Sequence, residues 1–279
     1  MTRVREYEAR ESLHQAISAA CASANINASQ IGRACIGIAG AARAEIAAAV
    51  RRFVAELIPG EIEVAGDMEI ALAAAFGAGP GVVVIAGTGS IAYGRDARGK
   101  TARAGGWGFA ISDEGSAHWI GRAAISALLR EADETGEFDS PLFRELTAAW
   151  QANTLQDLAS RANAQPNFAA LLPAVLAAAE SGDALAKRIL AQGAGELARL
   201  AAIIVRRLFP DNSLKGDGVA VAMAGGVFRY SEMVRGLFLN GLREQNVRGI
   251  LRRNVVDPVE GALQMARNRL ATSGCESGS

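Results

Sequence analysis

The chain has 279 residues, half of them hydrophobic, so it can build two lobes around a sizeable core. Lysine and arginine number 29 and aspartate and glutamate also number 29, and without a basic tract nucleic acid is not an expected partner. The apolar runs are shorter than the roughly 20 residues that a membrane span needs, so no membrane partner is expected either. Charged residues interrupt the N-terminus and argue against a signal peptide, which makes the cytoplasm the expected location.

The first part of the chain alternates helix and strand. Leu13, Ile17 and Cys21 recur at helical spacing and predict an opening helix. The elements expected after it are a strand over 34–39, a helix over 44–57, a strand over 61–65 and a helix over 70–76. Asp67 then stands between a strand and a helix, where ligand-contacting residues gather in open α/β sheets.

A turn rich in glycine and proline, residues 77–81, predicts a boundary between two lobes. The elements expected beyond it are strands over 82–86, 91–95 and 101–104, a mostly helical stretch from Ser116, a strand over 219–223, and helices over 231–243 and 258–270. We therefore expect residues 1–79 to form a partial N-terminal lobe, with a C-terminal helix over 258–272 packing back on it. Residues 80–257 are expected to form the C-terminal lobe.

The turn between the first two strands of this second part is glycine-rich: Gly87, Thr88, Gly89 and Ser90. Glycine allows backbone N–H groups to approach a phosphate closely and to adopt positive φ angles. The hydroxyl of Thr88 is suited to donate to a β- or γ-phosphate oxygen, and Ser90 adds a second hydroxyl. An ordinary hairpin turn would account for the same four residues.

A tryptophan ringed by glycines follows, in the run Gly105-Gly106-Trp107-Gly108. The indole suits a wall against which a sugar ring packs, while the amides of Gly106 and Gly108 reach ring oxygens. Asp113, just before a predicted helix, is suited to accept hydrogen bonds from sugar hydroxyls. The alternative is that Asp113 caps the helix that begins near Ser116.

Two further positions carry weaker signals. The carboxylate of Asp67 could take the proton of a sugar hydroxyl during phosphoryl transfer, or it could be a helix N-cap. Gly225 and Gly226 follow a buried strand and would let the backbone lie against a base or a phosphate. A glycine pair that serves helix packing is an equal alternative.

Cysteine and histidine give no metal-ligand pattern. Cys21, Cys35 and Cys275 form no close pair, and His14 and His118 are the only histidines. A zinc site is therefore not expected, and we assign no metal-ligating residues.

Taken in order, these motifs resemble the BadF/BadG/BcrA/BcrD-type ATPase family, and within it the N-acetylglucosamine kinase branch. The segments that carry the resemblance are VIAGTGSIAYG, AGGWGFAISDEGSAHWIGRAA, AAAESGDALAKRIL, VAMAGGVF and DPVEGALQMA. The resemblance implies an α/β, actin-like ATPase fold of two ribonuclease-H-like lobes, with ATP, Mg²⁺ and the sugar bound between them. It also implies a homodimer.

The resemblance assigns roles to single residues. Asp67 resembles the catalytic base, which contacts the phosphorylated hydroxyl, and Thr88 resembles a phosphate contact. The residues that match sugar contacts are Gly106, Trp107, Gly108 and Asp113. Those that match the adenosine side are Ala179, Gly225 and Gly226.

One family feature does not occur in the 279 residues: a D-G-G-G-T-K-T-like phosphate loop, which in the family precedes the segment matched here. That loop normally binds the γ-phosphate and helps position Mg²⁺. The chain as written is then either truncated, which its abrupt opening on a helix favours, or a natural variant without phosphoryl transfer. We expect little or no kinase activity from it.

Three functions follow from these residues. The leading one is phosphorylation of N-acetylglucosamine or glucosamine, at the 6-hydroxyl by resemblance. A second is an ATPase that activates a radical dehydratase through an iron–sulfur cluster, but none of the three cysteines is near the GGWG or AGG segments. A third is a non-catalytic sugar-binding regulator.

Overall fold

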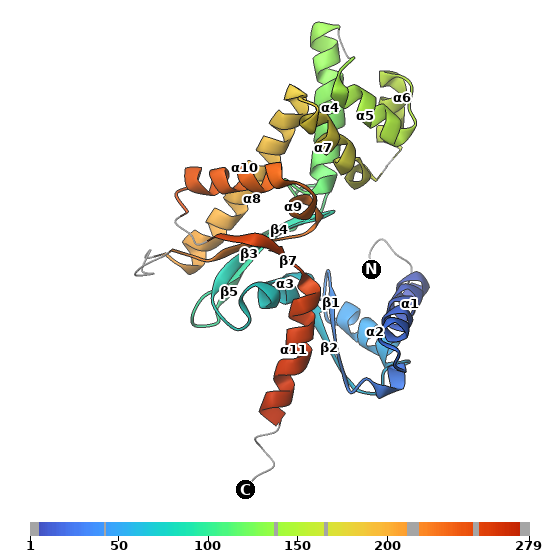
Figure 1. Cartoon of the computed structure of the whole chain (residues 1–279), viewed down its shortest axis with the longest axis vertical. Coiled ribbons are helices and arrows are strands. Elements are labelled where there is room, and N and C mark those ends of the chain that lie inside the picture. The colour runs from blue at the N-terminus through green and yellow to red at the C-terminus, as the bar shows by residue number, and fades with distance from the viewer. Residues whose placement is uncertain are drawn as a thin grey trace. The chain divides into compact units, whose positions relative to one another are not determined.

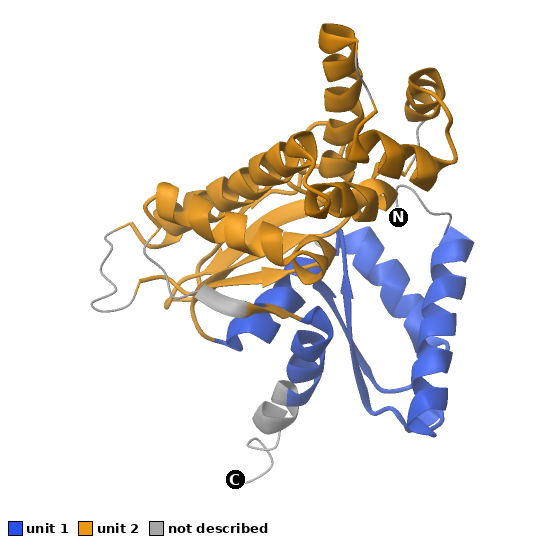
Figure 2. Cartoon of the chain, turned by 45° about the horizontal axis from the view of Figure 1, so that its top comes forward, with its two compact units in different colours: residues 1–78, 257–279 blue, residues 79–256 orange. Residues whose placement is uncertain are grey.

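The computed structural model describes residues 6–41, 43–136, 139–164, 167–210, 218–247 and 251–273. The chain divides into two compact units, residues 1–78 with 257–279, and residues 79–256 (Figure 2). The division points are Ala78–Gly79 and Val256–Asp257. Cys275 and residues 211–217 lie outside the described residues.

Unit 1 is built around two parallel strands. Its elements in chain order are α1 (Glu6–Ala24), the 3₁₀ helix η1 (Ala28–Gln30), β1 (Arg33–Ile38), α2 (Ala44–Ala55), β2 (Glu61–Gly66), α3 (Asp67–Phe76) and α11 (Pro258–Ser273). The strands pair from Arg33 opposite Glu61 to Ile38 opposite Gly66. Helix α3 therefore begins at the carboxyl end of a parallel strand, as the sequence predicts, but it begins at Asp67 instead of residue 70.

The core of unit 1 lies under α2, whose inward face places Ile46, Val50 and Val54 at helical spacing. Helix α11 packs against α3 and β1 within the same unit (Figure 1). The two helices approach so closely that a methyl group at Gly261 would overlap the carbonyl oxygen of Ile70. The C-terminal helix is thereby held on α3.

Unit 2 contains a five-stranded mixed sheet. Its strands are β3 (Gly81–Ala86), β4 (Ser90–Arg95), β5 (Thr101–Gly105), β6 (Val221–Ala224) and β7 (Leu251–Val256), in the order β5-β4-β3-β6-β7. β3, β4 and β5 form the antiparallel meander that turn residues predict, and β6 and β7 add in parallel. β7 is not foreseen from the sequence, because LRRNVV has a charged centre instead of an apolar run.

Helices cover the sheet and extend from it. They are α4 (Ala117–Thr135), α5 (Pro141–Trp150), α6 (Leu155–Asn163), the 3₁₀ helix η2 (Phe168–Leu171), α7 (Leu172–Glu180), α8 (Ala184–Leu208), α9 (Gly226–Tyr230) and α10 (Glu232–Glu244). The long helix α8 packs on β3, β4 and β5 and runs beside α10 (Figure 1). Gly94 permits this approach, since a methyl group there would lie 2.6 Å from Ile204 Cγ2.

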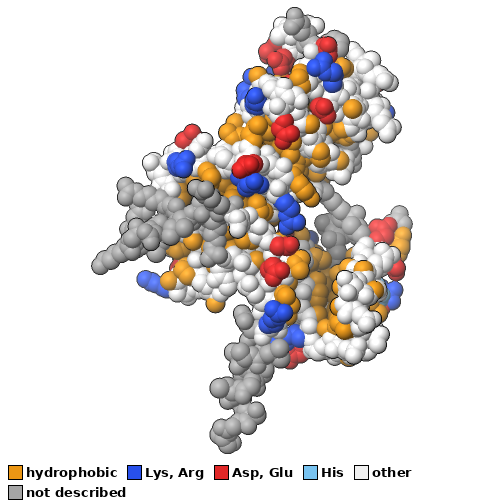
Figure 3. Space-filling model, viewed as in Figure 1, with side chains coloured by type: hydrophobic (Ala, Val, Ile, Leu, Met, Phe, Trp, Pro, Cys, Tyr) orange, Lys and Arg blue, Asp and Glu red, His pale blue; other side chains and the backbone are white. Residues whose placement is uncertain are grey.

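The described surface carries charges of both signs. On the face shown in Figure 3, Lys and Arg side chains are interspersed with Asp and Glu. Across the ranges that the structure describes, no helix combines the length and apolar character that crossing a bilayer requires.

Candidate functional site

The hairpin between β3 and β4 is tied to the start of α4. The N–H of Gly87 donates to the carbonyl of Gly89 at 2.9 Å, and the carbonyl of Gly87 accepts from the N–H of Ala117 at 2.8 Å. Thr88, at the tip, is exposed. A methyl group at Gly87 would meet no heavy atom of the described chain within 4 Å beyond its chain neighbours. The hairpin is thus held by its hydrogen bond to the start of α4, and space is open beside Gly87.

Ser90 does not have the role that the sequence predicts for its hydroxyl. The side chain is 3% exposed, and its Oγ donates to the carbonyl of Glu114 at 2.8 Å. In this structure the hydroxyl joins the hairpin to the segment before α4 and is not offered to a ligand. Thr88 keeps the exposed hydroxyl of the pair.

The loop after β5 depends on glycine. Gly105, Gly106 and Gly108 have φ angles of +73°, +70° and +101°, a region that favours glycine. The carbonyl of Gly108 then accepts from the N–H of Ser112 at 2.9 Å and closes the loop on itself. Trp107, held between the glycines, is 67% exposed. The indole therefore stands at the surface, as a wall for a flat ligand requires.

Asp113 joins this loop to the hairpin. Its side chain is 7% exposed, and the backbone N–H groups of Gly108 and Ser90 lie close enough to its carboxylate to lower its pKa. Gly89 makes room for it, since a methyl group there would lie 2.8 Å from Asp113 Oδ2. Burial raises the pKa of Asp113, and the two backbone N–H groups oppose that rise. The candidate phosphate turn and the candidate sugar loop thus share one carboxylate.

This geometry resolves one alternative. The N-cap of α4 is Ser116, whose Oγ accepts from the N–H of Trp119 at 3.1 Å, so Asp113 is not the helix cap. The N–H of Gly108 lies beside the Asp113 carboxylate, and its contact with a sugar oxygen stays a prediction. A carboxylate has about four lone-pair positions, so a sugar contact by Asp113 itself stays a prediction.

Gly225 lies at the corner of unit 2 that contains the Gly87–Ser90 hairpin and the Trp107 loop. It has a φ of +96°, and a methyl group there would overlap the carbonyl oxygen of Ala86, the residue before the hairpin. The turn from β6 into α9 therefore approaches the end of β3 at backbone contact. Gly226 begins α9, and a methyl group on it would lie 3.4 Å from the ring of Tyr230.

Ala179 lies near the end of α7. It is 1% exposed, within the main core under α7, and its carbonyl accepts from the N–H of Gly182 at 3.1 Å. Its place beside an adenosine stays a prediction.

Asp67 belongs to unit 1. It is half-buried at the first position of α3, and its Oδ1 accepts from the N–H of Met68 at 3.0 Å. The N-cap is Gly66, whose N–H donates to Glu69 Oε2 at 2.8 Å. Asp67 is therefore not the N-cap that the alternative required.

Arg103 is a feature of the corner that the sequence did not single out. Its Cζ lies 4.1 Å from the centroid of the Trp107 ring. A lone arginine in a strand carries no signal, so only the structure reveals this pair.

Aromatic contacts support the loop from the other end. Phe109 packs on His118 with ring centroids 4.9 Å apart, and His118 packs on Phe168 at 5.3 Å. These contacts connect the loop to α4 and η2.

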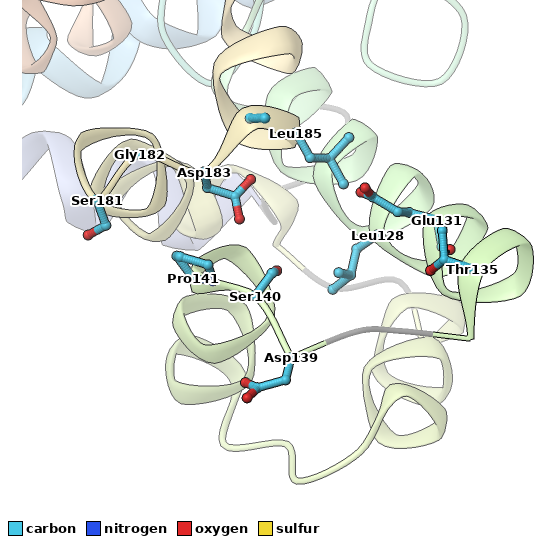
Figure 4. A pocket seen from close by; sticks show the side chains of 11 residues that line it. Leu128, Glu131, Thr135, Asp139, Ser140, Pro141, Ser181, Gly182, Asp183 and Leu185 are labelled. Atoms are coloured by element: carbon cyan, nitrogen blue, oxygen red, sulfur yellow. The ribbon is translucent and has the colours of Figure 1, made fainter.

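A cavity of about 400 Å³ lies elsewhere in unit 2 (Figure 4). It is lined by Leu128, Glu131, Thr135, Asp139, Ser140, Pro141 and residues 181–185. None of the predicted site residues lines it. Asp183 Oδ2 accepts from Leu142 N at 3.0 Å and Oδ1 from Ala186 N at 2.9 Å, so this carboxylate connects the starts of α5 and α8.

Acidic, histidine and cysteine side chains are dispersed in the part of the chain that the structure describes. No group of three or more His, Cys, Asp or Glu side chains there is placed to hold a metal ion. Cys21 and Cys35 are free thiols. Burial, followed by the charges of Glu63 and Glu69, raises the pKa of Cys35 to about 11, which suppresses the reactive thiolate.

Comparisons with known proteins point to sugar kinases. The chain is 35% identical over 243 residues to an N-acetylmuramic acid/N-acetylglucosamine kinase of Clostridium acetobutylicum, covering 84% of this chain and 76% of that protein. It is 28% identical over 246 residues to an N-acetyl-D-glucosamine kinase of Dictyostelium discoideum, covering 85% and 76%.

Solved structures agree on the fold. A Chromobacterium violaceum protein assigned as an N-acetylglucosamine kinase matches with a TM-score of 0.59 and 27% identity, over 78% of this chain and 71% of that one. A Porphyromonas gingivalis protein with the same assignment matches with a TM-score of 0.67 and 21% identity, over 87% and 80%. The α/β fold is that of the actin-like ATPases, which confirms the predicted fold class.

The family itself follows from the extent of the match. The model of the BadF/BadG/BcrA/BcrD ATPase family covers residues 1–266, nearly the whole chain. The chain belongs to the BadF/BadG/BcrA/BcrD ATPase family.

Proposed function

We propose that this protein is an ATP-dependent kinase that phosphorylates an amino sugar, N-acetylglucosamine or glucosamine, at its 6-hydroxyl. The observation that carries the proposal is the buried carboxylate of Asp113, which lies against Gly89 of the Gly87–Ser90 hairpin and beside the N–H of Gly108 in the Trp107 loop. A kinase must hold a nucleotide phosphate and an acceptor close together. The names of the two curated relatives support the choice of substrate.

In this proposal the residues divide the work. The hairpin backbone and the hydroxyl of Thr88 contact nucleotide phosphate, with Gly225 and Gly226 beside them and Ala179 toward the adenosine. Trp107 packs on the sugar ring. The amides of Gly106 and Gly108 contact its oxygens, and Asp113 accepts hydrogen bonds from its hydroxyls. Ser90 acts through its backbone, since its hydroxyl is engaged.

Asp67 is the proposed base. As the sugar oxygen forms a bond to the γ-phosphorus, the bond from that phosphorus to the bridging oxygen breaks and ADP leaves. The hydroxyl proton passes to the Asp67 carboxylate. Its one recorded bond, from the N–H of Met68, leaves oxygen lone pairs for that task.

Mg²⁺ fits this arrangement as part of the nucleotide substrate. Proteins usually hold it through one or two carboxylates together with substrate phosphates, so the lack of a three-ligand cluster among the described residues is compatible with it. Bound in that way, the ion would neutralise phosphate charge. Family resemblance alone underlies our further proposal of a homodimer, and the short apolar runs of the sequence underlie that of a cytoplasmic location.

Nucleotide binding is tested at Gly87. Because a methyl group there meets open space, Gly87→Ala should leave the stability unchanged and weaken ADP binding by roughly tenfold through contact with the phosphate. Gly236→Ala, also without a steric neighbour, is the matched control on α10. Calorimetric titration with ADP measures both. Equal affinities of the Gly87→Ala variant and the wild type would remove the hairpin from the nucleotide site.

Phosphoryl transfer is tested at Asp67. Asp67→Asn keeps an oxygen for Met68 but cannot take a proton, so sugar-dependent ADP release should fall by roughly 10²- to 10⁴-fold. The affinities for ADP and N-acetylglucosamine should stay near wild type. Because slow transfer is expected, product is followed by phosphorus NMR over long incubations. Sugar binding with no transfer, both by the wild type and after a D-G-G-G-T-K-T-like phosphate-loop segment is added at the N-terminus, would identify a sugar-binding regulator instead.

A further inference from the structure

The exposed indole of Trp107 requires a packing partner if it is to keep a single rotamer. It is 67% exposed, and the residues on either side, Gly106 and Gly108, lack side chains that could pack against it. An unsupported exposed indole samples several rotamers, and a sugar that packs on it must then bear the entropy cost of fixing one.

Arg103 supplies the support. Its guanidinium carbon lies 4.1 Å from the centroid of the Trp107 ring, within the range of a cation–π interaction. The same guanidinium donates from Nη1 to the carbonyl of Gly105 at 3.1 Å, so it is also bonded to the backbone of the loop.

The backbone of Arg103 is anchored in turn. Its carbonyl accepts from Nη1 of Arg207 on α8 at 3.0 Å, and in the sheet Arg103 pairs with Tyr93 of β4. The arginine is therefore fixed by strand β5 and helix α8, and its planar head covers one face of the indole. Among the described ion pairs none involves Arg103, so no acidic partner draws the guanidinium away from the ring.

The structure assigns to Arg103 the role of a positioning residue: its guanidinium fixes the Trp107 ring so that the opposite face is presented to the pyranose ring of the acceptor. This inference rests on the proposed function, since it takes Trp107 as the sugar wall. Arg103 acts on the sugar only through the indole. Arginine suits the task better than lysine because its planar head stacks on the ring.

Fluorine NMR on protein labelled with 5-fluorotryptophan tests the orientation directly. The chain has three tryptophans, and Trp107→Phe identifies the signal of Trp107. Arg103→Leu, which keeps an apolar stem but removes the cation, should shift or broaden that signal and leave those of Trp119 and Trp150 in place. Arg103→Lys should restore part of the wild-type signal. Arg98→Leu, at an exposed arginine in the β4–β5 turn, is the matched control and should change nothing.

Titration of the same samples with N-acetylglucosamine tests whether the fixed orientation of the Trp107 ring increases the affinity for the sugar. Arg103→Leu should raise the sugar dissociation constant by about two- to fivefold, with an intermediate value for Arg103→Lys and no change in ADP affinity. An unchanged Trp107 signal in Arg103→Leu would overturn the inference, as would a changed signal with unchanged sugar affinity. If Trp107→Ala left sugar affinity unaltered, the sugar wall of the proposed function would fail instead.

Discussion

Unit 2 contains two buried aspartates that look alike and for which we propose different roles. Asp113 and Asp183 are each 7% exposed, and each carboxylate lies beside two backbone N–H groups that belong to separate segments. The partners of Asp183 are first-turn amides of α5 and α8, which every helix leaves unpaired. The partners of Asp113 are amides of a glycine hairpin and a glycine loop.

The surroundings explain the difference. Asp183 has a φ of −56°, ordinary for a cap, whereas Asp113 has a φ of +66°, which is uncommon for a residue other than glycine. Open space lies beside Gly87 and Gly108, and Trp107 is exposed. Burial alone therefore does not distinguish the proposed ligand site from the helix junction; the positive φ of the aspartate itself does.

The largest expected effect separates Gly225, which lies against the end of β3, from Gly182, which precedes Asp183. Gly225 and Gly182 share a φ of +96°, but a methyl group at Gly225 overlaps a backbone carbonyl and one at Gly182 meets nothing within 4 Å in the described chain. We expect Gly225→Ala to lower the free energy of unfolding by about 4 kcal/mol through backbone strain and overpacking. Gly182→Ala should cost about 1 kcal/mol, from strain alone. Urea unfolding measures both variants. Equal losses would show that contact with the Ala86 carbonyl does not add to the cost at Gly225.

The next effect concerns Asp183. Asp183→Ala leaves the buried N–H groups of Leu142 and Ala186 without their acceptor, at a cost of about 3 kcal/mol. Asp139→Ala, which removes only a surface ion pair with Arg144, should cost about 0.5 kcal/mol or less and is the control. Thermal unfolding measures the difference. A small loss at Asp183 would mean that water reaches the two amides.

The smallest effect is a pH dependence at Asp113. Because burial raises its pKa, the folded protein holds this proton more tightly than the unfolded chain. The resulting stability is complete below the ordinary pKa of aspartate and is lost as pH rises through the raised, folded pKa. Asp113→Asn does not titrate, so its stability relative to wild type should increase over that interval.

Asp157 provides a control of opposite sign for this pH dependence. A hydrogen bond from the N–H of Asn153, with help from Thr154, lowers its pKa. The stability from that carboxylate is present above the ordinary pKa and is lost as pH falls through the lowered, folded pKa. Asp157→Asn should therefore lose stability relative to wild type as pH rises through this lower interval. Urea unfolding across pH measures both variants, and slopes of the same sign would contradict the account.

Much of this arrangement was predictable because glycine and apolar runs act locally. The strand before the hairpin, the turn itself and the glycines around Trp107 follow from the sequence, since φ preference and burial are properties of short segments. The role of Asp113 was not predictable, because its partners Ser90 and Gly108 approach only when the strands pair. The same holds for Arg103 over Trp107 and for the engaged hydroxyl of Ser90.

The central claim is that Asp113 serves a ligand site whereas Asp183 serves the fold. Calorimetric titration of ADP and of N-acetylglucosamine into Asp113→Ala and Asp183→Ala, both at a temperature where each variant is folded, compares them most directly. The account predicts that Asp113→Ala weakens both ligands by roughly tenfold or more and that Asp183→Ala binds both like the wild type. Wild-type affinity in Asp113→Ala, or equal losses in the two variants, would contradict it.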